Sequence, residues 1–166
     1  MPCKWTFQVR PLREIIDRYQ TPHTIWIDPF AGFCSPANIT NDLNPDAPTF
    51  YHLEALEFVN SLPNTGRYAG AIFDPPYSLT QVSRSYKDFG LKLKGKENPT
   101  GGFPKVKDRI AEILSIGGYV ISYGWNTVGM GKTRGFELVE VLVCCHGGNR
   151  NDTLVVVERK RDTDGD

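Results

Sequence analysis

The sequence predicts an α/β fold with a mostly parallel, doubly wound sheet and an antiparallel hairpin at its C-terminal end. Apolar runs typical of buried strands alternate with segments whose apolar residues have helical spacing, which is the pattern of successive β-α-β units. The last two apolar runs, 136–145 and 153–158, are separated only by the turn-rich residues 147–152, as in a β-hairpin. Such a sheet carries helices on both faces.

Apolar spacing places the elements of the first half. Residues 12–19 predict a short amphipathic helix, and residues 24–27 predict the first strand. A second short strand is expected near residues 39–41. Residues 51–62 have helical spacing again and lead into a strand that ends at Asp74.

The second half continues the alternation. A helix over 105–114 is expected to stop at Gly117-Gly118, a common C-terminal signal, before a strand over 119–123. The two hairpin strands then complete the sheet. We assign residues 1–160 to one domain and expect residues 161–166 to form a charged, disordered tail.

Composition limits the class of protein. The chain has 166 residues, 40% of them hydrophobic, and equal numbers of basic and acidic residues, as in a soluble globular domain. No stretch has the length of a membrane span, and the N-terminus lacks a signal-peptide hydrophobic region, so we predict a cytoplasmic location. The four cysteines show no Cys-x-x-Cys spacing, which indicates neither a zinc site nor a disulfide framework.

The most informative motif is Asp74-Pro75-Pro76-Tyr77, at the carboxyl end of a predicted strand. The two prolines stiffen the turn because each fixes its own φ and restricts the preceding residue. The Asp74 carboxylate and the Pro75 carbonyl can therefore accept hydrogen bonds from one planar amine and direct its lone pair at an electrophile. Tyr77 offers a face on which the base bearing that amine can stack. The alternative interpretation is a Pro-rich turn with a capping Asp.

A second acidic strand end lies upstream, in Asp28-Pro29-Phe30-Ala31-Gly32. A carboxylate there can pair with a ligand ammonium, and Gly32 lets the backbone approach a ligand closely. Asp42 follows the next strand, where doubly wound folds commonly place an acid that holds ribose hydroxyls. Each acid alone fits a turn or cap equally well. Their common order along one sheet edge favours ligand binding.

These motifs resemble those of the S-adenosylmethionine-dependent amino methyltransferases, especially the DNA adenine-N6 methyltransferases, over residues 7–158. The resemblance implies a single Rossmann-like methyltransferase domain with S-adenosylmethionine as cofactor and Asp74-Pro75-Pro76-Tyr77 as catalytic motif. It implies that Asp28 binds the methionine ammonium and that Asp42 binds the ribose hydroxyls. The implied cofactor-binding residues are Phe7, Asp28, Pro29, Phe30, Ala31, Gly32, Asp42, Glu54 and Ala55. Glu54 and Ala55 would lie at the adenine end, and residues 7–16 would close over the methionine end.

The chain departs from this family in three ways. Cys34 stands where the family usually has a second glycine. Only ten positions separate Gly32 from Asp42, so the first connecting helix must be a turn or absent. No segment is long enough to form a separate target-recognition domain.

The stretch 78–109 is the best substitute for such a domain, as a basic substrate-binding loop. It holds eight basic and three acidic residues, a net charge of +5, with aromatic residues interleaved, which suits a phosphate backbone and exposed bases. An ordinary solvated surface is the alternative. Trp125-Asn126, just past a strand, is expected to help form the base pocket or to pack. The candidate substrate-binding residues are Ser78, Arg84, Lys87, Lys92, Lys94, Lys96, Trp125 and Asn126.

The sequence therefore predicts an enzyme that transfers a methyl group to the N6 amine of adenine in DNA, as a monomer or homodimer. Asp74 favours adenine without excluding the cytosine amine, because among the enzymes that this sequence resembles the cytosine-N4 enzymes usually have Ser there and the protein-glutamine enzymes Asn. Two alternatives stay open. One is an RNA amino methyltransferase similar to the ribosomal RNA guanine-N2 enzymes. The other is a non-catalytic nucleic-acid-binding module on the same fold.

Overall fold

The computed structural model describes residues 6–88, 90, 103–148 and 151–162. Side chains of helical residues 79, 82, 84 and 85 lie outside this description. In chain order the elements are η1 (Thr6–Gln8), α1 (Arg10–Tyr19), β1 (Ile25–Asp28), β2 (Ile39–Thr40), α2 (Ala55–Ser61), β3 (Tyr68–Phe73), α3 (Leu79–Asp88), α4 (Pro104–Ile113), β4 (Leu114–Gly124), η3 (Lys132–Arg134), β5 (Phe136–Cys144) and β6 (Thr153–Lys160).

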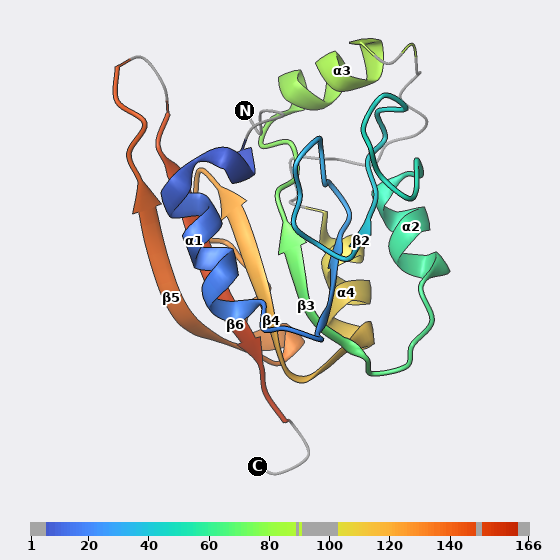
Figure 1. Ribbon diagram of the computed structural model, residues 1–166, viewed down its shortest axis with the longest axis vertical. Helices are drawn as coiled ribbons and strands as arrows, with labels where there is room; N and C mark the ends of the chain where they lie inside the picture. The colour runs from blue at the N-terminus through green and yellow to red at the C-terminus, as the bar shows by residue number, and fades with distance from the viewer. Residues whose placement is uncertain (1–5, 89, 91–102, 149–150, 163–166) are drawn as a thin grey trace.

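The elements build one six-stranded sheet in the order β2-β1-β3-β4-β6-β5. The first four strands in this order run parallel, and β6 runs antiparallel to both of its neighbours. The mostly parallel sheet with a C-terminal hairpin is therefore confirmed. The carboxyl ends of β1, β2, β3 and β4 meet at the upper edge of the sheet in Figure 1. Ligands bind outside this edge in open α/β sheets.

Helices cover both faces of the sheet, as predicted (Figure 1). On one face, α1 buries Leu12, Ile15 and Ile16 in a cluster with side chains of β1, β3, β4 and β6. These residues share one side of the helix because their spacing follows the helical period. On the other face, α2 and α4 pack their apolar residues, among them Phe58 and Ile110, against β1, β3 and β4.

One close contact fixes the packing of β1 against β3. A Cβ added at Gly70 would lie 2.3 Å from the Trp26 ring, whose side chain is fully buried. We expect Gly70→Ala to lower the free energy of unfolding by about 3 kcal/mol, because overpacking a rigid core ring forces strain into its neighbours. Urea unfolding measures this effect. Gly124→Ala is the matched control, since its nearest neighbours would lie at 3.7 Å; equal stability loss in both variants would contradict the packing argument.

Two predicted boundaries need correction. The helix predicted over 105–114 ends at Ile113, and Gly117-Gly118 lie inside β4 instead of ending the helix. The reason is that Leu114 is already extended, and the glycines sit where the register between β3 and β4 is irregular. The helix predicted to begin at residue 51 begins at Ala55, because Tyr51 first forms a bridge with Asn41.

The connections at the upper edge also bear on the predictions. Residues 29–38, all described, contain no helix, which confirms the shortened first connection. The predicted basic loop 78–109 contains α3 and the start of α4. Of the tail predicted over 161–166, residues 163–166 lie outside the described residues. Among the described residues, we find no helix with the length and hydropathy that a membrane crossing requires.

Candidate active site

Asp74 lies directly after β3 in a stiff, largely buried turn. Its side chain is only 2% exposed, and the preceding strand places it at the carboxyl edge of the sheet. Burial raises the pKa of Asp74 to about 6, against opposing hydrogen bonds from Tyr77 and Thr6 that favour the charged form. Asp74 is therefore mostly ionised at neutral pH and titrates within reach of ordinary buffers.

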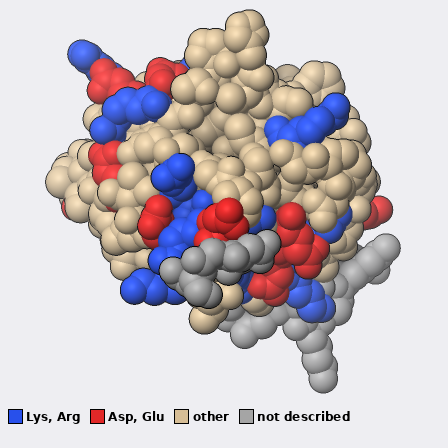
Figure 2. All heavy atoms as spheres, turned by 90° about the horizontal axis from the view of Figure 1, so that it is seen from below, with Lys and Arg blue, Asp and Glu red and all other residues tan. Residues whose placement is uncertain are grey.

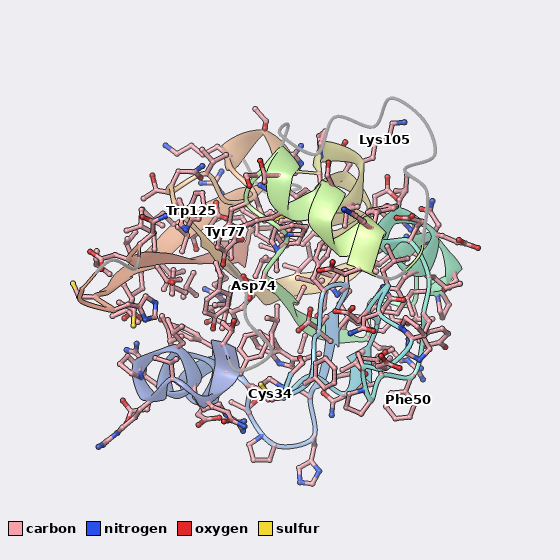
Figure 3. The ribbon with its side chains drawn as sticks, turned by 90° about the horizontal axis from the view of Figure 1, so that it is seen from above. Cys34, Phe50, Asp74, Tyr77, Lys105 and Trp125 are labelled. Carbon is pink, nitrogen blue, oxygen red and sulfur yellow. The ribbon has the colours of Figure 1, made fainter. Side chains whose placement is uncertain are left out.

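Tyr77 folds back onto this acid. Its hydroxyl donates a hydrogen bond to Oδ1 of Asp74, and its ring packs against Trp125 with centroids 5.4 Å apart and an interplanar angle of 59°. The side chain of Gln81, in α3, accepts from the Tyr77 N–H at 2.6 Å. Figure 3 shows Asp74, Tyr77 and Trp125 side by side at the centre of this edge. The Tyr77 hydroxyl thus occupies an Asp74 oxygen that the sequence assigned to a substrate amine.

Asp28 is buried at the end of β1, close to this turn. It is fully buried, and its carboxylate accepts hydrogen bonds from Ser35 Oγ at 2.6 Å and from the Phe30 N–H at 2.9 Å. Burial raises its pKa well above the usual value, opposed by these two bonds and reinforced by the negative charges of Asp74 and Asp42. The carboxylates of Asp74 and Asp42 therefore lie near enough to act on Asp28 at this edge.

Asp42 closes the loop that follows β1. Its two carboxylate oxygens accept from the N–H groups of Gly32 and Asn44, each at 2.8 Å. Gly32 has φ +56°, and no atom lies within 4 Å of the position that a Cβ would occupy. A side chain is disfavoured there by the backbone conformation, and the backbone borders open space. The loop with Cys34 in place of a second glycine is therefore held by Asp42 and Ser35.

Asn41 is a structural residue that sequence reasoning missed. Its buried amide donates to the carbonyls of Pro29 and Leu53, both at 3.0 Å, and accepts from the Leu53 N–H at 2.9 Å. Its backbone carbonyl accepts from the N–H of Ala31 at 2.9 Å. One side chain thereby ties the loop after β1 to the segment before α2. An Asn at a strand end is too common in turns to signal this role.

The other predicted cofactor residues differ in their surroundings. Phe7 is buried with its ring edge-to-face against Tyr123, centroids 5.6 Å apart. Phe30 packs between the rings of Phe73 and Phe103. These aromatic residues belong to the packing around the edge.

The predicted adenine end lies where α2 begins. Glu54 is exposed and precedes α2, and Ala55 is the first residue of that helix. Both carboxylate oxygens of Glu54 accept from the Tyr86 hydroxyl, at 2.6 and 2.7 Å. Because Tyr86 belongs to α3, this contact joins the helix that follows the Asp74 turn to the start of α2.

Only some of the predicted substrate-binding side chains belong to the described part of the structure. Ser78 lies at the start of α3, where its hydroxyl accepts from the Gln81 N–H at 3.2 Å, and Lys87 is exposed in the last turn of that helix. Trp125 is 41% exposed, and Asn126 accepts from the Val128 N–H. Arg84 lies on α3 with its side chain outside the description. Lys92, Lys94 and Lys96 lie outside the described residues.

Two of the eight basic residues in the stretch 78–109 bind the protein's own backbone. Lys107 is only 5% exposed and donates to backbone carbonyls. Arg109 donates to the carbonyls of Val59 and Leu62 and pairs with Glu112. Both side chains lie on a helix packed against the core. The charge of the stretch therefore overstates its basic surface.

The opposite edge of the molecule differs from the candidate site. Seen from below, basic and acidic side chains are interspersed on the visible face (Figure 2). At the upper edge, by contrast, Asp28 and Asp74 are buried, and the negative charges of Asp74 and Asp42 add to the rise in the pKa of Asp28. Such an arrangement attracts a cationic ligand, because its positive charge relieves the repulsion.

No protein-family model and no curated protein matches this chain. Solved structures resemble it in fold. The 1,6-didemethyltoxoflavin-N1-methyltransferase of Burkholderia thailandensis, solved with bound 1,6-didemethyltoxoflavin and S-adenosylhomocysteine, aligns with a TM-score of 0.63 and 14% identity, over 95% of this chain and 81% of its own. TrmN from Thermus thermophilus aligns with a TM-score of 0.57 and 16% identity, over 90% of this chain and 48% of its own. This chain has a Rossmann-like methyltransferase fold.

The methyltransferase fold confirms the predicted fold class. The two neighbours share the fold at identities too low to transfer an activity, so the chemistry has to be argued from the residues at the edge. Those residues are the acids Asp28, Asp42 and Asp74, a glycine that borders open space, and the aromatic pair of Tyr77 and Trp125 beside Asp74. The fold alone thus leaves the activity to be inferred from this arrangement.

Proposed function

We propose that this chain is an S-adenosylmethionine-dependent methyltransferase that acts on the N6 amine of adenine in DNA. One observation carries the proposal. Buried Asp74, in a turn of two prolines, lies beneath an aromatic pair at the same sheet edge as Asp28 and Asp42. The fold of the solved neighbours, one of them bound to S-adenosylhomocysteine, agrees with this use of the edge.

The residues at the edge fit the proposed cofactor. S-adenosylmethionine carries a positive sulfonium and an ammonium, and a positive charge beside Asp28 offsets the unfavourable effect of Asp74 and Asp42 on its carboxylate. Gly32 borders open space in a left-handed conformation, which lets a ligand approach the backbone. In this proposal Asp28 and the loop through Gly32 hold the methionine end, Asp42 the ribose, and Glu54-Ala55 the adenine.

The chain's own part in the reaction is orientation of the amine. When bound, the cofactor supplies an electrophilic methyl group. The carboxylate of Asp74 and the carbonyl of Pro75 each accept one hydrogen of the amine, so its lone pair points at the methyl group. Holding the reactants in line contributes several kcal/mol, on the order of 7 to 11 at best. Asp74 then takes up the proton that the amine releases, and its pKa of about 6 lets it pass the proton to water.

The aromatic pair supplies the base pocket in this proposal. The ring centroids of Tyr77 and Trp125 lie 5.4 Å apart, so a base stacks against one of the rings or separates the two. An adenine amine that reaches Asp74 replaces the Tyr77 hydroxyl as donor. Tyr77 therefore changes partner when a base enters.

DNA is the proposed polymer because of the basic residues after the turn. Replacing Lys92, Lys94 and Lys96 with Ala is expected to weaken DNA binding and to lower the slope of log K against log salt by about 2 to 3, as three phosphate contacts are lost. The matched control removes three exposed basic residues elsewhere, in Arg67→Ala, Lys132→Ala and Arg159→Ala. Fluorescence anisotropy with labelled DNA at several salt concentrations measures both. Equal slopes in the two triple variants would remove the support for this stretch as the binding surface.

The proposal is tested by cofactor binding followed by methyl transfer. Calorimetric titration with S-adenosylhomocysteine should give saturable binding, and a labelled-methyl assay should place label in DNA ahead of RNA or protein. Label in RNA alone would favour the RNA amino methyltransferase. Cofactor binding without transfer to any polymer would favour a non-catalytic module.

A further inference from the structure

Two charged side chains are buried behind the site and have no part in the proposed reaction. Lys107 of α4 and Glu158 of β6 are each 5% exposed. Burial of a charge is costly unless hydrogen bonds satisfy it. Burial also lowers the pKa of Lys107, reinforced by Arg134 and opposed by Glu158. Two such residues at one place call for a specific role.

Both side chains bind the backbone of the same segment. Lys107 Nζ donates to the carbonyls of Val128 and Gly129, at 3.2 and 2.9 Å. The carboxylate of Glu158 accepts from the N–H groups of Met130 and Gly131, the latter at 2.9 Å. Four consecutive residues are thus bound by two side chains of opposite charge.

Further contacts surround the hydrogen bonds that Lys107 and Glu158 make to this segment. A Cβ at Gly129 would lie 1.9 Å from Glu158 Oε2, so the carboxylate approaches only because glycine is there. Arg134 adds a hydrogen bond to the Met130 carbonyl at 2.9 Å. Lys107 Nζ also lies 5.3 Å from the centroid of the Phe73 ring, and Phe73 is the residue before Asp74. Lys107 therefore connects residues 128–131 to β3, the strand that precedes Asp74.

Residues 128–131 belong to segment 125–131, which begins at the candidate site. It follows β4 directly, and its first residue is Trp125, whose ring packs on Tyr77. Between Trp125 and Val128 lie only two residues, and the Val128 N–H is bound to Asn126. A shift of the backbone of residues 128–131 is therefore expected to move Trp125.

We propose that Lys107 and Glu158 are positioning residues that fix segment 125–131, and with it the place of Trp125 against Tyr77 above Asp74. Neither is among the residues that the proposed function assigns to substrate or cofactor. Their catalytic consequence rests on the proposed function, whereas the placement of Trp125 does not. Misplacement of a base-binding ring by about 1 Å is expected to lower kcat/KM on the order of 10- to 100-fold.

Labelling with 5-fluorotryptophan gives a direct readout of this placement, with the Trp125 resonance assigned by Trp125→Phe. We expect Lys107→Met and Glu158→Gln each to shift or broaden the Trp125 fluorine resonance and to lower kcat/KM. Affinity for S-adenosylhomocysteine should stay within about twofold. Ile110→Val, a fully buried change on the same helix, is the control for general loosening.

A second measurement needs no variant. In the wild-type protein the amides of Met130 and Gly131 should exchange with solvent as slowly as those of β4, because a buried carboxylate binds them. Rapid exchange of these amides would overturn the proposal. So would an unmoved Trp125 resonance in Lys107→Met and Glu158→Gln, or an equal shift in Ile110→Val. The fluorine spectra and the amide exchange are both measured without substrate. Absence of methyl transfer by the wild type would therefore count against the proposed function alone.

Discussion

Asp74→Ala is expected to lower kcat for methyl transfer by a factor of about 100 to 1000, while the affinity for S-adenosylhomocysteine changes little. The substitution removes the acceptor that orients the amine, and loss of one such preorganised group costs about 2.7 to 4 kcal/mol in the transition state. Single-turnover transfer of labelled methyl groups to DNA measures the rate, and calorimetry measures cofactor binding.

Asp46→Ala provides the control for this substitution. Asp46 is an exposed carboxylate in the segment between β2 and α2, and its backbone N–H is bound to the Asn44 side chain. Its loss should leave the rate at the wild-type level. Turnover at the wild-type rate in Asp74→Ala would contradict the assignment of Asp74 to the amine.

Tyr77 links the base pocket to the titration of Asp74, and two substitutions separate these roles. Tyr77→Ala removes the ring and should cost about 1 to 3 kcal/mol of base stacking, seen as a higher KM. Tyr77→Phe keeps the ring and loses the hydroxyl that donates to Asp74. Because that hydrogen bond lowers the pKa of Asp74, its loss raises the pKa above the wild-type value of about 6.

The pH profile shows this change. Transfer requires the charged form of Asp74, so kcat/KM for the wild type should fall about tenfold per pH unit below pH 6. In Tyr77→Phe the same fall should begin at a higher pH. Tyr19→Phe removes a hydroxyl that donates to Glu140, away from the site, and should keep the wild-type profile. A profile of Tyr77→Phe that coincides with the wild type would show that the hydroxyl does not act on Asp74.

The convergence of the acids was predictable from the sequence. Asp28 and Asp74 each end an apolar run, Asp42 follows a short strand, and the carboxyl ends of parallel strands meet at one edge. The absent helix between β1 and β2 was predictable from the ten positions between Gly32 and Asp42. Both patterns are local in the sequence, and the parallel sheet brings the strand ends that carry the acids to one edge.

The supporting residues were not predictable, because their partners are backbone groups of distant segments. Asn41 binds Pro29 and Leu53, and Lys107 and Glu158 bind segment 128–131. Nothing in the residue types or their spacing distinguishes such side chains from surface charges. For the same reason a count of charges over 78–109 assigned Lys107 to the basic surface, where the structure buries it. Pattern reasoning finds strand ends and misses long-range hydrogen bonds.

Nucleoside analysis of DNA after incubation with the wild-type protein and deuterated-methyl S-adenosylmethionine provides the decisive measurement. Enzymatic digestion followed by mass spectrometry identifies the base and the atom that receive the methyl group, and Asp74→Ala serves as the blank. We predict labelled N6-methyladenine in the wild-type sample and none in the blank. Labelled N4-methylcytosine, or DNA without label although the cofactor binds, would contradict the proposed function.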